Sequence, residues 1–209
     1  MKQYIYDGGN SMEHLTVSLV LYGGPKLAKT PFAKTVASCL ANLHQSNSKS
    51  EPFAIVVRTV ESLPRGGDPR MKSGVPIVFD DIRPSQTRGS RPALAVEDMK
   101  VLGDVSEGGD LSARYSDLHF EPLMPRIWTS NADSPTEFYR SLPADLETMT
   151  NEQVMGLDAH VFALVKRFAF CRIDQCLIPH AVREAYEASR VSQVRDVGAQ
   201  LFSGANAIP

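Results

Sequence analysis

The sequence has few of the features that would place a protein outside the ordinary globular class. Only three cysteines occur in 209 residues; Cys39, Cys171 and Cys176 are widely spread and show no CxxC spacing. Neither a disulfide framework nor a zinc site is expected, and a reducing intracellular compartment fits best. No run of about 18 apolar residues occurs, so no membrane-spanning segment is predicted. The first residues do not resemble a secretory signal.

Charge and histidine are equally unremarkable. The formal net charge is -2, which gives no support to a general nucleic-acid coat, although a local positive stripe remains compatible with it. The five histidines stand singly, show no metal spacing, and are expected to be surface or packing residues. They are His14, His44, His119, His160 and His180.

Apolar runs alternate with amphipathic stretches, which predicts an α/β protein with a mainly parallel sheet flanked by helices. Strands are expected at 18–22, 53–57, 75–79, 125–129 and near 168–173. Helices are expected at 30–43, 93–102, within 157–169, and at 178–202. Residues 104–120 predict an inserted β-hairpin that turns at Gly108 and Gly109. We divide the chain into a lead-in (1–16), one domain (17–175) and a helical extension (176–209).

A glycine-containing segment between the first strand and the first helix has the spacing of a phosphate-binding loop. Its residues are Gly23, Gly24, Pro25, Lys26, Leu27, Ala28, Lys29 and Thr30. In such a loop, backbone N–H groups hold phosphate oxygens, the lysine reaches the terminal phosphates and the hydroxyl ligates Mg²⁺. Ala28 stands where the pattern has glycine. A chance turn before a helix is the alternative interpretation.

Two other strands end in polar residues. Asp80 and Asp81 follow the 75–79 strand, where one carboxylate can serve Mg²⁺ and the other can orient or deprotonate water. Asn131 ends the next buried strand, where a neutral amide can hold the attacking water or touch a γ-phosphate. A solvated strand end and a polar turn are the respective alternatives.

In this order, the three segments resemble the superfamily 3 helicase/ATPase domain of viral replication proteins, especially those of circular single-stranded DNA viruses. The resemblance covers residues 15–175. It implies an AAA+-like P-loop NTPase fold in which 102–115 is similar to the family's pore hairpin. The segment 163–168 is similar to the one that carries an arginine finger.

The resemblance implies a role for each matching residue. Lys29 would bind the β- and γ-phosphates, Thr30 and Asp80 the Mg²⁺, and Asp81 the water. Asn131 would be the sensor. Arg167 would reach a neighbouring subunit's site, with Lys166 as the weaker candidate and a solvated helix end as the alternative. Arg114 would contact nucleic acid; Arg83, Arg88 and Arg91 would supply a basic flank or a solvated loop.

Two departures from the family are evident. Ala28 puts nucleotide affinity in doubt, and Glu107 and Asp110 give the expected hairpin an acidic tip, which would repel a strand. The family's upstream nicking endonuclease has no counterpart before Ser18, so we expect the motor without the nickase, a fragment or a remnant.

The leading hypothesis is an ATP- and Mg²⁺-dependent helicase-like ATPase, active on single-stranded DNA or RNA as a homo-oligomeric ring, a hexamer, without a membrane partner. It would act in the nucleus or the cytoplasm of a host. The alternative is a degenerate P-loop domain that binds nucleotide or assembles without turnover. A small-molecule kinase is a third, less favoured hypothesis.

Overall fold

The computed structural model describes residues 17–45, 53–65, 67–85, 93–113 and 116–177. The expected lead-in and the expected helix at 178–202 lie outside these residues, as do Arg88, Arg91 and Arg114. Within the described residues, no helix is both long and apolar enough to span a membrane.

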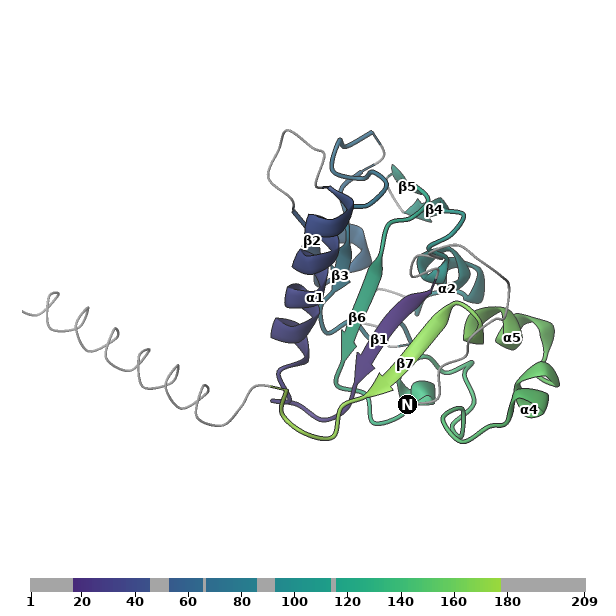
Figure 1. Ribbon diagram of the computed structural model, residues 1–209. Coiled ribbons are helices and arrows are strands. Elements are labelled where there is room, and N and C mark those ends of the chain that lie inside the picture. The colour runs from purple at the N-terminus through teal and green to yellow at the C-terminus, as the bar shows by residue number, and fades with distance from the viewer. Residues whose placement is uncertain (1–16, 46–52, 66, 86–92, 114–115, 178–209) are drawn as a thin grey trace, which may run out of the picture.

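Five strands form a central sheet in the order β2–β3–β6–β1–β7 (Figure 1). Their bounds are β1 (Ser18–Tyr22), β2 (Ile55–Val57), β3 (Ile77–Phe79), β6 (Arg126–Ser130) and β7 (Phe168–Arg172). All four pairings are parallel, which confirms the predicted sheet. Pro76 lies just before β3, where its missing N–H does not interrupt the strand ladder.

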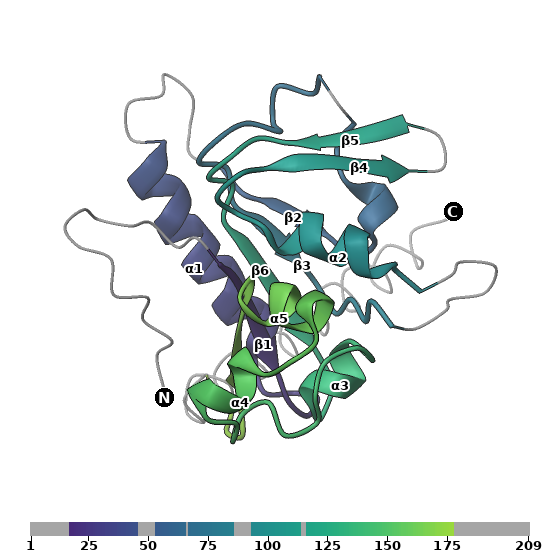
Figure 2. The same ribbon diagram turned by 90° about the vertical axis from the view of Figure 1, so that its right-hand side faces the viewer.

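Helices flank both faces of the sheet (Figures 1 and 2). One face is covered by α1 (Lys29–His44), whose buried residues Ala33, Ala37 and Ala41 recur every fourth position and let the helix approach closely. Side chains from four other helices and one 3₁₀ turn join the core on the opposite face. These are η1 (Val60–Ser62), α2 (Val96–Gly103), α3 (Pro135–Phe138), α4 (Asn151–Met155) and α5 (Ala159–Val165).

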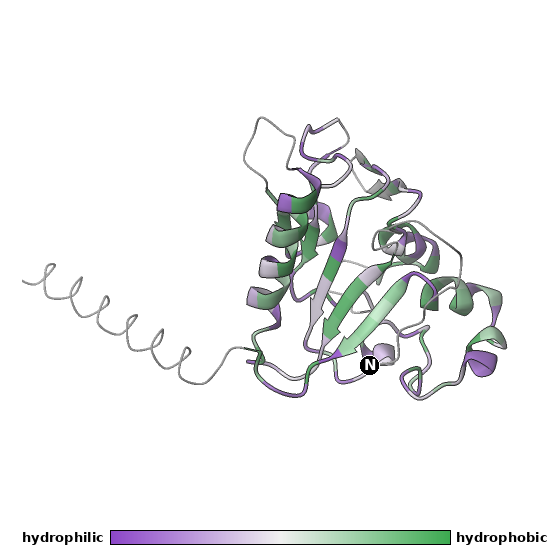
Figure 3. Cartoon of the chain, in the orientation of Figure 1, coloured by the Kyte–Doolittle hydropathy of each residue, from purple (hydrophilic) through white to green (hydrophobic). Residues whose placement is uncertain are grey.

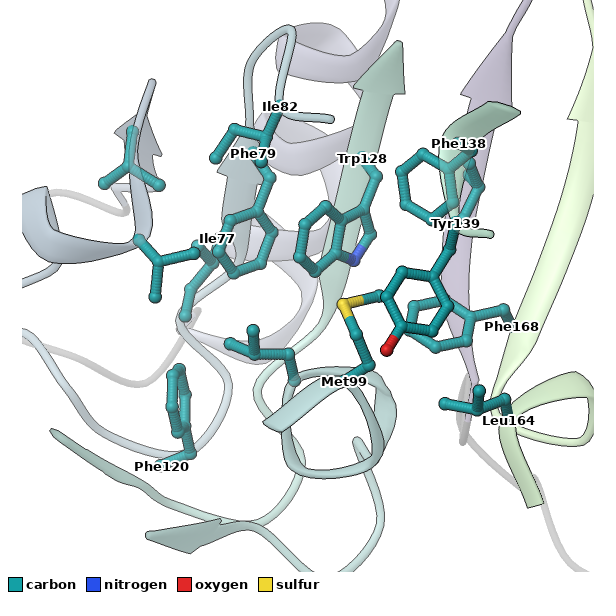
Figure 4. Close-up of a cluster of buried hydrophobic side chains, with 14 of the residues drawn as sticks. Ile77, Phe79, Ile82, Met99, Phe120, Trp128, Phe138, Tyr139, Leu164 and Phe168 are labelled. Atoms are coloured by element: carbon teal, nitrogen blue, oxygen red, sulfur yellow. The ribbon is translucent and has the colours of Figure 1, made fainter. Parts of the chain in front are cut away.

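The larger hydrophobic core lies on the face opposite α1 and is built around Trp128 (Figure 4). Its ring stacks on Phe79 with centroids 3.9 Å apart, while Phe138 and Phe168 meet it edge-on at 5.8 and 6.2 Å. Offset stacked and edge-on pairs are the arrangements that aromatic rings prefer. In Figure 3, β1 and β7 are coloured mainly as apolar, which agrees with the burial of this sheet. Trp128 and Phe168 are both buried.

The connections after β1 and β6 leave the sheet toward opposite faces. Helix α1 follows β1 on one face, whereas Phe138 of α3, which follows β6, belongs to the core of the other face. Because β1 and β6 are neighbours, their carboxyl ends border the crevice in which open parallel sheets bind ligands.

The hairpin is present, but its turn is not where the glycines predicted it. Strand β4 (Gly109–Ala113) pairs antiparallel with β5 (Ser116–Phe120), and Ala113 faces Ser116, so the chain reverses between these two residues. Gly108 and Gly109 lie at the open end, with φ of 71° and 148°. A Cβ on Gly108 would overlap the Phe120 carbonyl oxygen, so this glycine permits a close approach.

The expectation of an acidic hairpin tip is therefore wrong. Glu107 precedes β4, and Asp110 pairs across the open end with His119, Oδ1 to Nδ1 at 2.7 Å. The Asp110 carboxylate raises the pKa of His119. The acidic tip is therefore no longer a difference between this chain and the helicase family that it resembles.

A buried cation links the hairpin and α2 to the sheet. Arg126 is 1% exposed, stacks over the Phe120 ring at 4.5 Å and donates to the Val101 carbonyl oxygen. Burial lowers its pKa to about 10, although Asp104 acts in the opposite direction. This contact fixes the end of β5 nearest to the sheet.

Candidate functional site

The three polar segments meet at the carboxyl edge of the sheet. The β1–α1 loop (residues 23–28) follows β1, Asp80 and Asp81 follow β3, and Asn131 follows β6. Because β3, β6 and β1 are successive strands of the sheet, their ends are adjacent in space. Segments separated by 50 and 102 residues are thereby joined by direct hydrogen bonds.

Lys29 is the buried cation of this edge, with 6% of its surface exposed. Its Nζ donates to the carbonyl oxygens of Gly23 at 2.9 Å and Gly24 at 2.6 Å, and to Asn131 Oδ1 at 3.0 Å. Burial lowers the pKa of Lys29 from its usual value, although the carboxylates of Asp81 and Asp133 act in the opposite direction. Only neutral oxygens accept directly from this ammonium among the hydrogen bonds of the described residues, so an anion would be a stronger acceptor.

A hydroxyl and a carboxylate form the second part of the site. Thr30 Oγ1 donates to Asp80 Oδ1 at 2.5 Å, and Thr129 Oγ1 donates to the same oxygen at 3.2 Å. Asp80 is 8% exposed, and its backbone N–H donates to the Val57 carbonyl at 2.7 Å. The first helical hydroxyl of α1 and the first acid after β3 are therefore in direct contact.

Asn131 connects the lysine to the second acid. Its Oδ1 accepts from Lys29, and its Nδ2 donates to Asp81 Oδ1 at 3.0 Å. The Asp81 backbone N–H donates to Thr129 Oγ1 at 3.0 Å, and its φ of 54° lies in the left-handed region, which Asp and Asn tolerate better than most residues. The amide thus spans the two charged groups without adding charge.

This donor set fits Mg²⁺ better than a transition metal. Among the described residues, no group of three His, Cys, Asp or Glu side chains could hold a metal. Mg²⁺ is commonly held by one or two protein oxygens together with water and substrate phosphates. The touching oxygens of Thr30 and Asp80 are the pair that could supply them.

The β1–α1 loop divides into exposed and packed residues. Pro25 and Lys26 are exposed, and Lys26 has a φ of 63°. Leu27 packs against the smaller core beneath α1, and its carbonyl accepts from the Leu177 N–H at 3.1 Å. The N-terminus of α1 has neither a side-chain cap nor an acidic residue in its first turn, so the helix supplies no anion of its own to its positive end.

Gly23 and Gly24 differ sharply in what they tolerate. Gly23 has a φ of 134°, and an added Cβ would overlap the backbone oxygen of Ile173, whereas nothing lies within 4 Å of a Cβ on Gly24. We expect Gly23→Ala to lower the free energy of unfolding by at least about 2 kcal/mol. Gly24→Ala, the matched control, should stay within about 0.5 kcal/mol of wild type. Urea unfolding measures both, and equal losses would contradict the strain assigned to Gly23.

Ala28 explains why the motif has glycine at this position. It is the N-cap of α1 with φ 60° and ψ 26°, a left-handed conformation that is unfavourable for a residue with a Cβ. We expect Ala28→Gly to raise the free energy of unfolding by about 0.5–1 kcal/mol, because relief of strain exceeds the added freedom of the unfolded chain. Ala33→Gly, inside α1, should instead lose about 1 kcal/mol. A loss in both variants would show that the α1 N-terminus is unstrained.

The structure adds two arginines that the sequence analysis did not place at the site. Arg58, directly after β2, is 84% exposed in its side chain, and its Nε lies 3.5 Å from Asp80 Oδ2. Arg83 donates from Nη2 to the Asn131 carbonyl at 3.0 Å and pairs through Nη1 with Glu137 Oε1 at 3.0 Å. The only sequence signal for Arg58 is its position after a buried strand, and Arg83 had been expected in a basic flank.

Arg167 lies elsewhere. It precedes β7, its carbonyl accepts from the Ser18 N–H, and its Nε donates to Asp104 Oδ2 at 2.9 Å. This is the amino-terminal edge of the sheet, about 16 Å away along a five-residue strand. The structure does not bring Arg167 to the site of its own chain. Lys166 is exposed at the end of α5, and Arg114 is outside the described residues.

The geometry combines a lysine, a hydroxyl, two carboxylates and an amide at the open end of a parallel sheet. Such a set can hold an anion and a hard cation side by side, and it leaves Asp81 to act on a water molecule. No protein-family model matches the chain, and no curated protein matches it either. The function has therefore to be argued from this geometry.

Proposed function

We propose that this protein is a Mg²⁺-dependent nucleoside-triphosphatase of the superfamily 3 helicase type. One observation carries the proposal: a single hydrogen-bonded network at the sheet edge contains the predicted residues. Two bonds connect Lys29, Asn131 and Asp81, a third connects Thr30 and Asp80, and the Thr129 hydroxyl joins the two groups by bonding to both acids. The sequence-based interpretation required these residues to meet although three different segments supply them. Neighbouring strand ends meet in any sheet of this order, but a phosphate and Mg²⁺ site also requires the contacts of the lysine with the amide and of the hydroxyl with the acid, and both are present.

The fold supports the same proposal. A parallel sheet with helices on both faces, whose first strand leads through a glycine loop into a helix, is compatible with a P-loop NTPase. The candidate residues lie at the carboxyl edge where the connections after β1 and β6 leave toward opposite faces of the sheet, which is the ligand-binding edge of such sheets.

Each residue has a chemical task in the proposed reaction. Lys29 would exchange its carbonyl partners for the β- and γ-phosphate oxygens, and Thr30 and Asp80 would hold Mg²⁺. When bound, the metal neutralises phosphate charge. Asp81 orients a water molecule and accepts its proton as the water oxygen bonds to the γ-phosphorus. The bond between the γ-phosphorus and the bridging oxygen then breaks, which releases the nucleoside diphosphate and inorganic phosphate. Asn131 holds the lysine and the acid in register.

The oligomeric and nucleic-acid parts of the proposal rest on the resemblance. A ring would let Arg167 act on a neighbouring subunit's site, and its position away from its own site is compatible with that role. To do so, Arg167 must first exchange its bond to Asp104. Although burial alone raises the pKa of Asp104, hydrogen bonds from Ser106, Glu107 and Arg167 lower it, so the acid is a stable anionic partner.

The test is steady-state ATP hydrolysis by the purified chain with Mg²⁺, with and without single-stranded DNA or RNA, over a range of protein concentrations. We expect activity that rises faster than linearly with protein concentration and increases when a strand is added. Nucleotide binding without hydrolysis would support the alternative, a degenerate P-loop module. The strained backbone at Ala28 is the observation that points to this alternative. Absence of nucleotide binding would refute the ATPase and the nucleotide-binding form of the alternative, and would leave only a domain that assembles without turnover.

A further inference from the structure

The backbone that carries Asn131 is held from outside the nucleotide network. Strand β6 ends at Ser130, so Asn131 lies beyond the strand ladder. Its carbonyl accepts from Arg83 Nη2 at 3.0 Å, and two residues later the Asp133 N–H donates to Glu137 Oε2 at 2.8 Å. The next carbonyl, that of Ala132, accepts from the Gly23 N–H at 2.9 Å.

Arg83 and Glu137 act together, and we name this pair the Arg83 clamp. Arg83 Nη1 and Glu137 Oε1 are 3.0 Å apart, so each side chain uses one arm for the other and one arm for the backbone of residues 131–133. A planar guanidinium presents several donors in fixed directions, which suits two simultaneous contacts in a way that a lysine ammonium does not.

The clamp is poorly placed to serve mainly as a stabilising ion pair. The side chain of Arg83 is 27% exposed and that of Glu137 is 40% exposed, and ion pairs this accessible contribute little to stability because water and salt screen them. What the clamp fixes instead is the path of the chain on which Asn131 sits. The Asn131 side chain must reach Lys29 on one side and Asp81 on the other.

We propose that Arg83 is a positioning residue, which, braced by Glu137, places Asn131 between the lysine and the water-orienting acid. The inference rests on the proposed ATPase function and assigns that function a residue outside its motifs. It also replaces the earlier view of Arg83 as part of a basic flank for nucleic acid. A contact to a nucleic-acid strand needs only a free positive charge, whereas the clamp needs both arms of the guanidinium.

The test compares Arg83→Gln, Glu137→Gln, the double variant and Arg83→Lys in steady-state ATP hydrolysis. We expect each single change to lower kcat by roughly 10- to 100-fold, the range for a misplaced catalytic group, with KM for ATP within about threefold of wild type. The double variant should be no worse than either single one, because the two side chains act as a unit. Arg83→Lys should resemble Arg83→Gln. Arg140→Gln, an exposed arginine three residues after Glu137, is the control and should leave kcat unchanged.

Amide hydrogen exchange at Asp133 provides a readout that does not require turnover. Its N–H should exchange at least about tenfold faster in both variants than in wild type. In Arg83→Gln the Glu137 acceptor loses its ion-pair partner, and in Glu137→Gln the carboxylate acceptor is replaced by a weaker, neutral amide. Wild-type turnover, measured first, tests the proposed function by itself. If the wild type is active, three results would overturn the inference. They are a wild-type kcat in Arg83→Lys, a loss of kcat in the double variant that equals the two single losses combined, and a loss confined to the stimulation of ATP hydrolysis by a nucleic-acid strand. Unchanged exchange at Asp133 overturns it whether or not the wild type is active.

Discussion

Asp81→Asn is expected to lower kcat for ATP hydrolysis by about 10²–10⁴-fold, the usual contribution of a general base, while ATP affinity stays within about threefold of wild type. Asparagine cannot accept the proton of the attacking water. It can, however, still accept the hydrogen bond from Asn131 Nδ2 that holds this position now. Turnover under saturating ATP and equilibrium binding of a labelled nucleotide measure the two quantities separately.

The backbone conformation of Asp81 allows this substitution without added strain. Asp81 has a φ of 54°, and asparagine is among the residues that tolerate the left-handed region, whereas alanine would add strain. Asp145→Asn, an exposed acid outside the site, is the matched control and should change neither quantity. If Asp81→Asn hydrolysed ATP as fast as wild type, Asp81 would have no role in activating water.

The sequence predicted the secondary structure correctly where burial of an element produces a local pattern of apolar residues. Parallel strands covered on both faces are continuous apolar runs, and three of them, β1, β3 and β6, are followed by the residues that form the candidate site. Helix α1 was expected at 30–43 and spans Lys29–His44, because its buried alanines repeat at helical spacing. The place of the polar segments at the carboxyl ends of parallel strands was also predicted, whereas the order that makes β3, β6 and β1 neighbours was not.

The hairpin turn was not predictable from sequence because glycine has two uses that look alike. Gly108 and Gly109 resemble a tight turn, yet they lie where the hairpin backbone passes close to Phe120. Nothing local distinguishes a residue that needs positive φ to reverse the chain from one that needs an absent Cβ. Because the turn was predicted at the wrong end of the hairpin, the charge of Asp110 was also assigned to the tip, whereas it lies at the open end.

The arginine contacts were hidden for a different reason. Arg83 meets Asn131 and Glu137 across 48 and 54 residues, and such pairs depend on tertiary placement, which local periodicity does not encode. Among neighbouring arginines, Arg83 looked like part of a solvated run. Its selective pairing follows from the path of the chain after Asp81 and from the N-cap of α3, Ser134, whose side chain accepts from the Glu137 N–H. That cap fixes the residue that braces Arg83.

Lys29→Ala is expected to weaken ATP binding by about 100-fold or more, since at least two charged hydrogen bonds of about 1.5–3 kcal/mol each would be lost. In the structure, the three donors of Nζ are directed to Gly23, Gly24 and Asn131. All three acceptors are neutral, so the incoming phosphates offer the first charge-matched partners and the exchange is favourable. Equilibrium binding of a labelled nucleotide in the presence of Mg²⁺ measures the loss.

Two further variants separate the lost charge from lost packing. Lys29→Met keeps most of the buried side-chain volume and should lose affinity as severely as Lys29→Ala, whereas Lys34→Ala, an exposed position on the same helix, should bind ATP as wild type does. Thermal unfolding of each variant establishes that it is folded under the binding conditions. If Lys29→Met bound nucleotide normally, the β1–α1 loop would not hold phosphate. The hydrogen bonds of Lys29 to Gly23, Gly24 and Asn131 would then only stabilise the chain after β1 and β6.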